Sequence, residues 1–249
     1  MKSQSSDRLM SIIESFLVLP HQTLSEVASA CELEPPTAIR YLRQLVDRGW
    51  LERDERSKSY TLGVALVTLG EAAQAAQPIR IRALPYMREV LRQFDETVNI
   101  AIRHRGEVVV VEALEGRQSI RRGAMVGEKD EWFVSSLGKA ILAHSPEKEV
   151  LELLELHPPI RRTKNTLMSK EEIFADLANI RQCGYALDDE EAEIGLKCVG
   201  VPIWGGTNHV SYALSVSGPT QRIESRLSEI ILTLKEAAAA ISLANKGAQ

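Results

Sequence analysis

The sequence predicts an α+β protein that begins with a winged helix-turn-helix and continues through a linker helix into a larger α/β domain. Three short helical patterns occupy residues 6–48, and two strand-like runs flank a polar loop in residues 50–62. After residue 84, strand and helix patterns mix. We place the first domain at residues 1–63, the linker helix at 64–82 and the second domain at 83–249.

The first two helices have clear start and stop signals. Apolar residues repeat at helical spacing between Leu9 and Leu17, and Pro20 ends the pattern. Thr23 precedes the second helix, and Glu26 follows three residues later, which is the spacing of a capping box. Both segments are therefore predicted to be short helices with one apolar face.

A third helix and a hairpin complete the first domain. Pro35 and Pro36 can occupy the first turn of this helix, where a missing N–H costs little, and Gly49 suits the position after its end. Residues 50–53 and 59–62 are short strand-like runs around the polar loop. A β-hairpin directly after a third helix predicts a winged helix-turn-helix.

The rest of the chain mixes helices and strands. Residues 66–77 are rich in alanine and compatible with a helix up to Pro78, so we expect a helical linker rather than a flexible one. Periodicity and turn residues predict the elements that follow. The predicted helices are 84–94, 136–144, 146–156, 169–183 and 222–243, and the predicted strands are 98–102, 108–113, 119–125, 185–188, 196–203 and 210–217.

The composition is that of an ordinary globular protein. Hydrophobic residues make up 44% and charged residues 26% of the 249 residues, and the net charge is -4. Cys31, Cys183 and Cys198 are far apart and odd in number, which argues against a disulfide framework or a zinc site and fits a reducing cytoplasm. The sequence shows no signal peptide and no run of about 18 apolar residues. We therefore expect a cytoplasmic protein without a metal, a cofactor or a membrane partner.

The third helix is expected to read DNA. In a helix-turn-helix, the second helix of the pair lies in the major groove, and its N-terminal side chains reach base edges. Arginine and glutamine can contact guanine and adenine, and basic residues on the hairpin can neutralise phosphates. We predict contacts from the helix positions off the apolar stripe and from the hairpin, namely Thr37, Ala38, Arg40, Tyr41, Arg43 and Gln44, with Arg53, Arg56 and Lys58.

The charge balance leaves a second interpretation open. Residues 1–62 contain eight Lys and Arg against nine Asp and Glu, a net charge of -1, whereas a DNA-binding domain is usually more basic. A three-helix unit with a hairpin can also bind another protein. The distribution of charge favours DNA, because Glu32 and Glu34 precede the third helix while Arg40 and Arg43 lie along it.

Four motifs in the second domain are more specific than those in the first. They are Thr97-Val98-Asn99, Ser136-Leu137-Gly138-Lys139-Ala140, Gly184 to Glu191 with Gly195 to Cys198, and Ser215 to Pro219. Weaker motifs in the first domain are Leu24 to Ala28, Thr37 to Leu45, Gly49 to Arg53 and Tyr60 to Gly63. Because these motifs occur in this order and at this spacing, the chain resembles the IclR family of bacterial transcription regulators over nearly its whole length.

This resemblance implies a winged helix-turn-helix that binds double-stranded operator DNA and a GAF-like C-terminal domain that binds a small effector. It also implies homodimers, often paired into homotetramers. Two positions depart from the family pattern. Pro35-Pro36 stands where Lys-Ser usually precedes the recognition-helix Thr, and Asp130 to Phe133 replaces a Leu-Pro-x-His run. We therefore expect the operator and the effector pocket to differ from those of relatives.

The family's pocket positions fall on residues that suit an anionic effector. Free N–H groups at the start of a helix attract a carboxylate, and an arginine can pair with it. Serines two residues apart on a strand point the same way, and Trp132 and Phe133 can stack on a ring. We predict a small organic acid as the effector, and the family resemblance adds aromatic acids to the candidates. The predicted contacts come from Ser119, Arg122, Trp132, Ser136, Leu137, Asp188, Leu196, Cys198, Ser215 and Ser217.

Other roles stay open for several of these residues. Ser215 and Ser217 can satisfy backbone groups at a strand end, and Cys198 can be a small buried apolar residue. Asp188 can belong to a solvated turn. Arg122 follows another arginine in a predicted strand, so only one of the two can face the pocket. The residues therefore predict where an effector binds and leave its identity open.

Two rival functions are a ligand-sensing protein that acts by protein contacts without DNA, and a small-molecule enzyme. Gly138-Lys139 lacks the GxxxxGK[ST] spacing of a phosphate loop, so we expect Lys139 either to cap local structure or to pair with an acid. The histidines show no metal-binding spacing, and nothing in the sequence places one beside Cys198 as a nucleophile pair. We therefore predict that the protein is not an enzyme.

Overall fold

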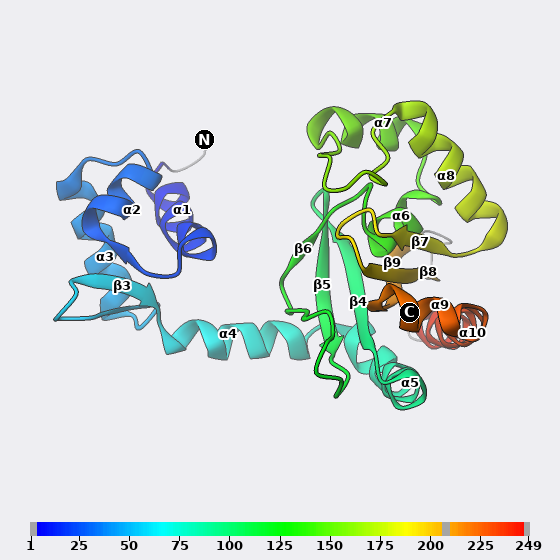
Figure 1. Ribbon diagram of the computed structural model, residues 1–249. Coiled ribbons are helices and arrows are strands. Elements are labelled where there is room, and N and C mark those ends of the chain that lie inside the picture. Colours follow the sequence, from blue (N-terminus) through cyan, green and yellow to red (C-terminus); the bar gives the residue numbers. More distant parts are fainter. Residues whose placement is uncertain (1–3, 206–209, 247–249) are drawn as a thin grey trace. The chain divides into compact units, whose positions relative to one another are not determined.

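The computed structural model describes residues 4–205 and 210–246, and the few residues at the outer ends of the predicted domains lie outside this description. The chain divides into two compact units, Met1–Ala76 and Gln77–Gln249. We call them the N-terminal unit and the C-terminal unit (Figure 1). None of the helices within the described ranges is long and apolar enough to cross a membrane.

The N-terminal unit begins with the three predicted helices, α1 (Gln4–Val18), α2 (Leu24–Ala30) and α3 (Pro35–Asp47). The capping box of α2 is confirmed, because the Thr23 hydroxyl accepts the Glu26 N–H and a Glu26 carboxylate oxygen accepts the Thr23 N–H at 2.7 Å. Apolar side chains from the three helices and the adjoining sheet form the core, which includes Ile12, Phe16, Val27, Leu42, Leu45, Leu51 and Tyr60.

A three-stranded sheet follows these helices. Strands β2 (Leu51–Arg53) and β3 (Ser59–Leu62) form the predicted hairpin, and a short strand that the sequence did not indicate, β1 (Gln22–Thr23), pairs with β3. Helix α4 (Val64–Ala75) comes next, and none of its twelve residues, all of them described, is buried. The N-terminal unit therefore has the predicted winged helix-turn-helix fold followed by a helix.

The C-terminal unit is built on one antiparallel sheet of six strands in the order β6-β5-β4-β9-β8-β7. The first and last strands of this unit meet at the centre of the sheet, because β4 pairs with β9. The strands are β4 (Thr97–His104), β5 (Glu107–Leu114), β6 (Lys129–Asp130), β7 (Ala186–Asp189), β8 (Leu196–Trp204) and β9 (Val210–Pro219).

One face of this sheet is covered by α5 (Pro78–Phe94), α9 (Thr220–Ser225) and α10 (Leu227–Lys246). Figure 1 shows these helices together on the same side of the strands. Buried apolar side chains such as Met87 of α5 and Ile100 of β4 belong to a single cluster at this face. The larger of the two cores of this unit therefore lies between the sheet and these helices.

The opposite face is covered by α6 (Ser136–Leu142), α7 (Glu147–Leu156) and α8 (Lys170–Cys183). Helix α6 lies closest to the sheet, and every one of its seven residues is buried. Ile141 of α6 and Ala101 of β4 belong to the second apolar cluster. The mixed helices and strands predicted for this part of the chain thus form a sheet between two helical layers. That this domain resembles GAF domains stays a prediction.

The structure corrects the extent of the linker helix. The sequence predicted a helix over residues 64–82 and another from Leu84, whereas α4 ends at Ala75 and α5 begins at Pro78. A proline suits the first turn of a helix, where it lacks only an N–H that has no partner there. Ile79 is buried in the C-terminal core, which ties the start of α5 to that unit.

Two further predictions of secondary structure are wrong. Residues 119–125 form a loop instead of a strand, because Lys129–Asp130 takes the place beside β5. The predicted final helix, 222–243, is divided into α9 and α10 at Arg226. The Arg226 guanidinium lies 4.5 Å from the centre of the Phe94 ring, a tertiary contact that local sequence does not reveal.

Gly200 in β8 allows α6 to approach the sheet. A Cβ at this position would lie 2.4 Å from the carbonyl oxygen of Ser136 and 3.0 Å from its Cβ. We predict that Gly200→Ala destabilises the protein by about 1–3 kcal/mol, because the added methyl forces the helix away from the strand. Urea unfolding measures the loss. Gly123→Ala is the control, because its methyl would meet nothing closer than 3.9 Å, and equal midpoints for wild type and Gly200→Ala would contradict the prediction.

Candidate functional site

Helix α3 carries a polar face in the N-terminal unit. Arg40, Arg43 and Gln44 are exposed, and Thr37 is half-buried. Thr37, Arg40 and Gln44 are three and four residues apart, so they share one side of the helix, and Arg43 flanks it. Guanidinium and amide groups in this arrangement present several hydrogen-bond donors of the kind that contact base edges. Four of the six predicted α3 residues therefore lie together on an accessible face.

The expectation that Ala38 and Tyr41 face outward is wrong. Ala38 is fully buried and Tyr41 is 3% exposed, and both lie in the apolar stripe with Leu42 and Leu45. The tyrosine ring supplies apolar area to the core, which outweighs the polar hydroxyl that placed it among the outward residues. Tyr41 still contacts the polar face of α3, because the Arg40 guanidinium lies 5.0 Å from the centre of the tyrosine ring.

The β2–β3 hairpin holds the three predicted cations, Arg53 at the end of β2 and Arg56 and Lys58 in the loop, and all three are exposed. Two of them share Glu55, with Lys58 Nζ at 2.9 Å and Arg53 Nη1 at 3.4 Å from its carboxylate oxygens. The hydrogen bond from Lys58 and the charge of Arg53 lower the pKa of Glu55. Arg56 forms no ion pair within the described part of the chain. The hairpin therefore offers one free cation and two that are partly neutralised.

In the C-terminal unit, a row of polar side chains crosses the sheet on the face toward α6. Asp188 of β7 pairs with Cys198 of β8, Cys198 with Ser217 of β9, and Ser217 with Thr97 of β4. All four are buried. We call this set the first row. It brings three of the predicted effector residues together and adds Thr97, which the sequence analysis did not select.

A second row lies two residues further along the same strands. Gly200 pairs with Ser215, and Ser215 pairs with Asn99 of β4. Ser215 and Asn99 are each 1% exposed. Within the described residues, neither Ser215 Oγ nor Asn99 Oδ1 has a hydrogen-bond partner. The sheet thus provides a polar floor of two rows, and the second row contains unsatisfied polar atoms.

The start of α6 lies over this floor. The Ser135 hydroxyl caps the helix by accepting the Gly138 N–H at 3.0 Å. Ser136 and Leu137 are buried in the first turn of the helix. Backbone N–H groups in a first turn have no hydrogen-bond acceptor within the helix. The close approach of Ser136 to Gly200 sets the helix directly against the second row. Both residues therefore lie where the sequence predicted them, beside the polar strands.

The loop between β5 and β6 brings Arg122 to the first row. The Thr97 hydroxyl donates to the Arg122 carbonyl at 2.6 Å, and Arg122 Nη2 lies 3.5 Å from Glu128 Oε1. Arg122 also lines an open pocket of about 530 Å³. The residues around this pocket are Ile120, Arg121, Arg122, Gly123, Glu193, Ile194, Gly195, Leu196 and Pro219. Arg122 and Leu196 share this pocket, whereas Ser119 is exposed on the loop outside it.

Carboxyl groups border the floor as well. Burial raises the pKa of Asp130 to about 6, against the opposing charge of Arg122. Burial also raises the pKa of Asp188, whose Oδ1 accepts the backbone N–H of Glu191 at 2.8 Å and of Ala192 at 3.2 Å. Asp188 therefore closes the turn after β7. With Asp130 and Asp188 at its border, the floor has two carboxyl groups to set against the guanidinium of Arg122.

Lys139 anchors α6 to that turn. Its ammonium is 3% exposed and pairs with Glu191 and, at 3.1 Å, with Asp176 of α8. The prediction that Lys139 pairs with an acid is confirmed. Burial raises the pKa of Glu191 to about 7, although Lys139 opposes the shift. The described residues contain no group of three or more His, Cys, Asp or Glu side chains that could hold a metal ion.

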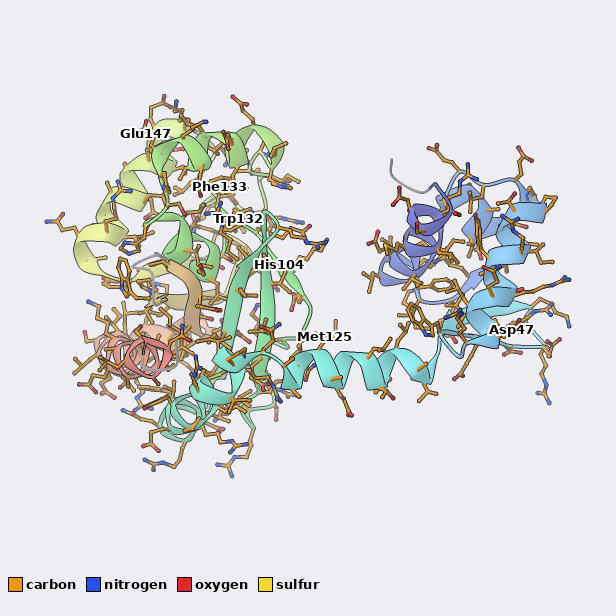
Figure 2. All side chains as sticks on the ribbon, turned by 180° about the vertical axis from the view of Figure 1, so that it is seen from behind. Asp47, His104, Met125, Trp132, Phe133 and Glu147 are labelled. Atoms are coloured by element: carbon orange, nitrogen blue, oxygen red, sulfur yellow. The ribbon has the colours of Figure 1, made fainter. Side chains whose placement is uncertain are left out.

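Trp132 lies apart from the two rows. It packs in the apolar cluster that includes Ala101 and Val108, and its Nε1 donates to the Gly106 carbonyl at 2.9 Å. Figure 2 shows Trp132 and the neighbouring Phe133 in the layer of helices above the strands. The expectation that Trp132 stacks on an effector beside Arg122 therefore has no support in this geometry.

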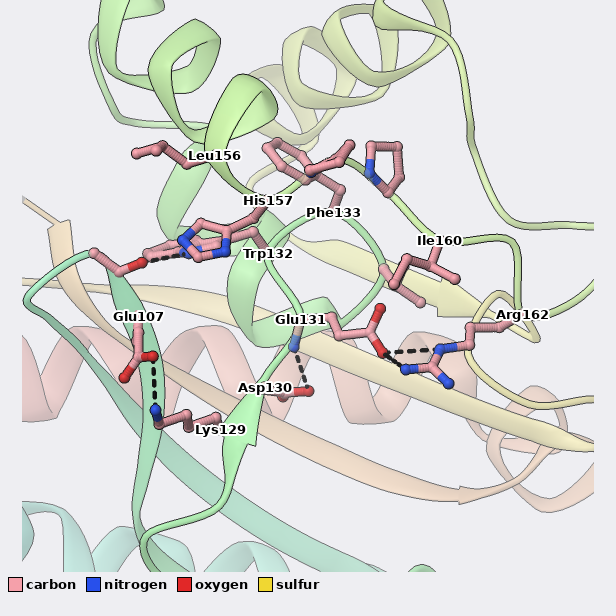
Figure 3. A pocket seen from close by; sticks show the side chains of 14 residues that line it. Glu107, Lys129, Asp130, Glu131, Trp132, Phe133, Leu156, His157, Ile160 and Arg162 are labelled. Carbon is pink, nitrogen blue, oxygen red and sulfur yellow. Dashed lines mark hydrogen bonds and ion pairs between the residues drawn. The ribbon is translucent and has the colours of Figure 1, made fainter. Parts of the chain in front are cut away.

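Trp132 instead lines a pocket of about 460 Å³ near the tip of the β4–β5 hairpin. Two ion pairs flank it, Lys129 with Glu107 at 2.7 Å and Arg162 with Glu131 at 2.7 Å (Figure 3). Its apolar lining consists of Trp132, Phe133, Val134, Leu156, Pro158, Pro159 and Ile160. Its four ion-paired side chains satisfy one another, whereas Asn99 Oδ1 and Ser215 Oγ of the second row have no partner among the described residues.

Three residues of the candidate site were missed by the sequence analysis. Thr97 and Asn99 are polar positions two residues apart at the start of β4, the same spacing that Ser215 and Ser217 have on β9. Asp130 belongs to a segment that was noted only as a departure from the family pattern. The alternation along β4 was therefore sufficient to find two of the three.

Comparisons with known proteins match both units. A family model described as the IclR helix-turn-helix domain matches residues 5–55, and one described as the bacterial transcriptional regulator IclR C-terminal matches residues 71–243. The HTH-type transcriptional regulator BhcR of Paracoccus denitrificans is 31% identical over 237 residues, which are 95% of this chain and 85% of that protein.

Solved structures share the fold over nearly the full chain. The crystal structure of the Thermotoga maritima IclR is 30% identical, with a TM-score of 0.77, and the match covers 97% of this chain and 98% of that one. An IclR homologue from Microbacterium hydrocarbonoxydans, complexed with 4-hydroxybenzoate, is 28% identical with a TM-score of 0.84, over 97% of this chain and 98% of its own.

The shifted pKa of Asp130 makes stability depend on pH. A carboxyl whose pKa is about 6 in the folded protein and about 3.9 in the unfolded chain stabilises the fold while protonated, and this contribution is lost as pH rises through 6. We predict that Asp130→Asn raises the melting temperature at pH 7.5 and changes it little at pH 4. Scanning calorimetry across this range measures the difference.

A carboxylate of opposite behaviour in the same unit is the control. Glu172 accepts the N–H of Ser169 in the capping box of α8, which lowers the pKa of Glu172. Glu172→Gln should therefore lower the melting temperature at pH 7.5, where the wild-type carboxylate is charged. A pH-independent effect of Asp130→Asn would contradict the prediction.

Proposed function

This chain belongs to the IclR family of bacterial transcriptional regulators, with a helix-turn-helix DNA-binding domain and a C-terminal effector domain, and we propose the surfaces and the chemistry that it uses. In our proposal, α3 and the β2–β3 hairpin bind operator DNA, and a small organic acid binds on the polar floor of the C-terminal unit. The observation that carries the effector site is the second row, where the buried Asn99 Oδ1 and Ser215 Oγ have no hydrogen-bond partner among the described residues.

The DNA surface consists of the exposed α3 residues and the hairpin. Arg40, Arg43 and Gln44 can reach base edges when α3 enters the major groove. Arg56 is the hairpin cation free to approach a phosphate, whereas the pairing of Lys58 with Glu55 must be exchanged for such a contact. This small number of cations favours recognition through a few base contacts over strong nonspecific attraction.

The start of α3 has a consequence for the operator. Pro35 and Pro36 occupy its first two positions, and neither has a backbone N–H to offer to a phosphate. The Glu34 side chain makes no capping hydrogen bond there. The helix therefore depends on Arg40, Arg43 and Gln44, further along, for its contacts, and we infer an operator that differs from those of relatives with Lys-Ser at this point.

For the effector, the first row and Arg122 favour a carboxylate. The charge of Arg122 acts to lower the pKa of both Asp130 and Cys198, against the larger effect of burial. A carboxylate there can take a bidentate pair from the guanidinium and a hydrogen bond from Ser217. The IclR homologue from Microbacterium hydrocarbonoxydans is complexed with 4-hydroxybenzoate, which fits an aromatic acid as a candidate. Contacts from Ser136, Leu137 and Ser119 stay predictions.

Catalysis is disfavoured by the state of Cys198. Burial raises the pKa of its thiol, and a nucleophilic cysteine needs a thiolate, which requires a lowered pKa. The relatives named above are transcriptional regulators. We therefore propose that the floor binds its ligand without changing it, and that the protein works in the cytoplasm, the bacterial compartment that holds operator DNA.

Helix α4 supports the proposal of a dimer. Val64 is 69% exposed, Val67 60% and Leu69 49%. Apolar side chains crowded along one helix at such exposure are typical of a surface that binds another chain. We propose that α4 packs against a second copy and so fixes the distance between two recognition helices. Tetramers would need a further contact between dimers.

Mutation of the α3 arginines tests the DNA surface. We predict that Arg40→Ala and Arg43→Ala each weaken binding to the upstream region of the protein's own gene by about 10-fold or more, because each removes base contacts worth about 1–3 kcal/mol. Fluorescence anisotropy at several salt concentrations measures this. Arg92→Ala, which removes an exposed arginine paired with Glu89 in α5, should bind like wild type. Unchanged affinity in both α3 variants would exclude this surface.

Mutation of α4 tests the dimer. We predict that Val67→Glu converts a dimer into a monomer at micromolar concentration, because a carboxylate cannot be buried unpaired in an apolar contact. Sedimentation equilibrium measures the mass. Thr68→Glu adds the same charge at the next position and should leave most of the dimer intact. A Val67→Glu protein that stays dimeric would rule out α4 as the interface.

A further inference from the structure

The buried side-chain atoms without a hydrogen bond fall into two groups within the described residues. The charged ones belong to ion pairs, such as Asp176 and Glu191 with Lys139. The neutral ones lie on Asn99, His144, Ser215 and Thr220. Asn99 and Ser215 stand out among them because they are cross-strand partners in the second row.

Leaving these two groups unpaired is costly. A buried polar atom without a partner loses its hydrogen bonds to water and gains none in return. The neighbouring row shows the usual outcome, because the Thr97 hydroxyl donates to the Arg122 carbonyl at 2.6 Å. Asn99 and Ser215 are as deeply buried as Thr97 yet remain unmatched. One acceptor, Asn99 Oδ1, and one hydroxyl, Ser215 Oγ, therefore keep hydrogen-bonding capacity that no described residue uses.

We infer that the effector carries a hydroxyl group that binds between Asn99 and Ser215, so that this protein recognises a hydroxylated organic acid. The inference rests on the proposed effector site. Asn99 Oδ1 is an acceptor and needs a donor, while the Ser215 hydroxyl can donate to an oxygen. A hydroxyl does both at once. A second carboxylate would bring no donor to Asn99, and a methyl or ring edge would satisfy neither group.

An ammonium group could also donate to Asn99, but the second row does not suit a charge. Gly200, the third member of the row, and Ala186 of β7, which pairs with Gly200, carry no carboxylate. A buried ammonium without a counter-ion costs far more than a hydrogen bond returns. The acids of the site lie elsewhere, with Asp188 in the first row and Asp130 beside Ser135 and Arg122. A neutral hydroxyl is therefore the better match.

The spacing of the rows sets the shape of the ligand. Positions two residues apart on a strand are separated by about 7 Å. The carboxylate lies at Arg122 and Ser217 in the first row, and the hydroxyl lies at Asn99 and Ser215 in the second. A rigid acid with its hydroxyl across a six-membered ring spans this separation, whereas a hydroxyl on the carbon next to the carboxylate does not.

Binding of matched acids tests the inference. The probes are benzoate, 4-hydroxybenzoate, 4-methoxybenzoate and 2-hydroxybenzoate, titrated calorimetrically into the full chain. Wild type should bind 4-hydroxybenzoate at least 10-fold more tightly than the other three, because the methoxy oxygen cannot donate and the 2-hydroxyl cannot reach Asn99. In Asn99→Leu, 4-hydroxybenzoate should bind no better than benzoate.

The outcomes separate this inference from the proposed function. Equal binding of benzoate and 4-hydroxybenzoate by wild type overturns the hydroxyl and leaves the acid site standing, and so does a preference that survives in Asn99→Leu. If none of the four acids binds, both the acid site and the hydroxyl are overturned. Loss of all binding in Arg122→Ala, with the preference intact in wild type, supports both.

A second measurement needs no ligand. Replacing the unmatched amide by an apolar side chain of similar size should raise the melting temperature of Asn99→Leu by about 2–4 °C, because the cost of the buried amide disappears. Thr97→Val is the matched control and should lower it, since it removes a hydroxyl that already has a partner. A melting temperature that falls in Asn99→Leu as it does in Thr97→Val would show that the amide is needed by the fold, and would overturn the inference.

Discussion

The alternation of side chains along β4 and β9 is the constraint on which the C-terminal unit depends. Val98 and Val216 point into the core beneath α5 and α10, while their neighbours Asn99, Ser215 and Ser217 point to the opposite face. A slip of one residue in this pairing would bury the polar set under α10 and turn the apolar set toward α6. The register that builds the core therefore also builds the polar floor, and the floor cannot shift without unfolding the sheet.

Ion pairs then hold the walls of the site around that floor. Lys139 ties α6 to the turn after β7 through Glu191, and Arg222 of α9 holds Glu96 at the start of β4 while donating to the Ile120 carbonyl. Buried ion pairs contribute little net stability, because desolvation offsets their attraction. Their value here is geometric, since they fix the helix and the loop that carry the groups facing the floor.

Features set by local interactions could be predicted from the sequence. The capping box predicted at Thr23 is confirmed because both of its partners lie within four residues of each other. Features set by distant contacts could not. Tyr41 is buried in the apolar core of its unit, and the last predicted helix is divided at Arg226, whose guanidinium packs on the Phe94 ring. The candidate site combines both kinds of feature. The shared face of Ser215 and Ser217 follows from strand alternation, and the same pattern in β4 was overlooked. The pairing of these strands across the sheet could not be predicted, because it joins residues that are distant in sequence.

The charges of the effector site bear on how a ligand can act at a distance. Arg122 is already 3.5 Å from Glu128 of its own loop, and burial keeps the pKa of Asp130 near 6. An anionic ligand at Arg122 competes with Glu128 and repels an ionised Asp130. Its binding must therefore release Glu128, or bring a proton to Asp130, or both. Release of Glu128 removes a contact within the loop between β5 and β6, so a ligand that occupies the floor has a direct means of favouring one arrangement of this unit over another.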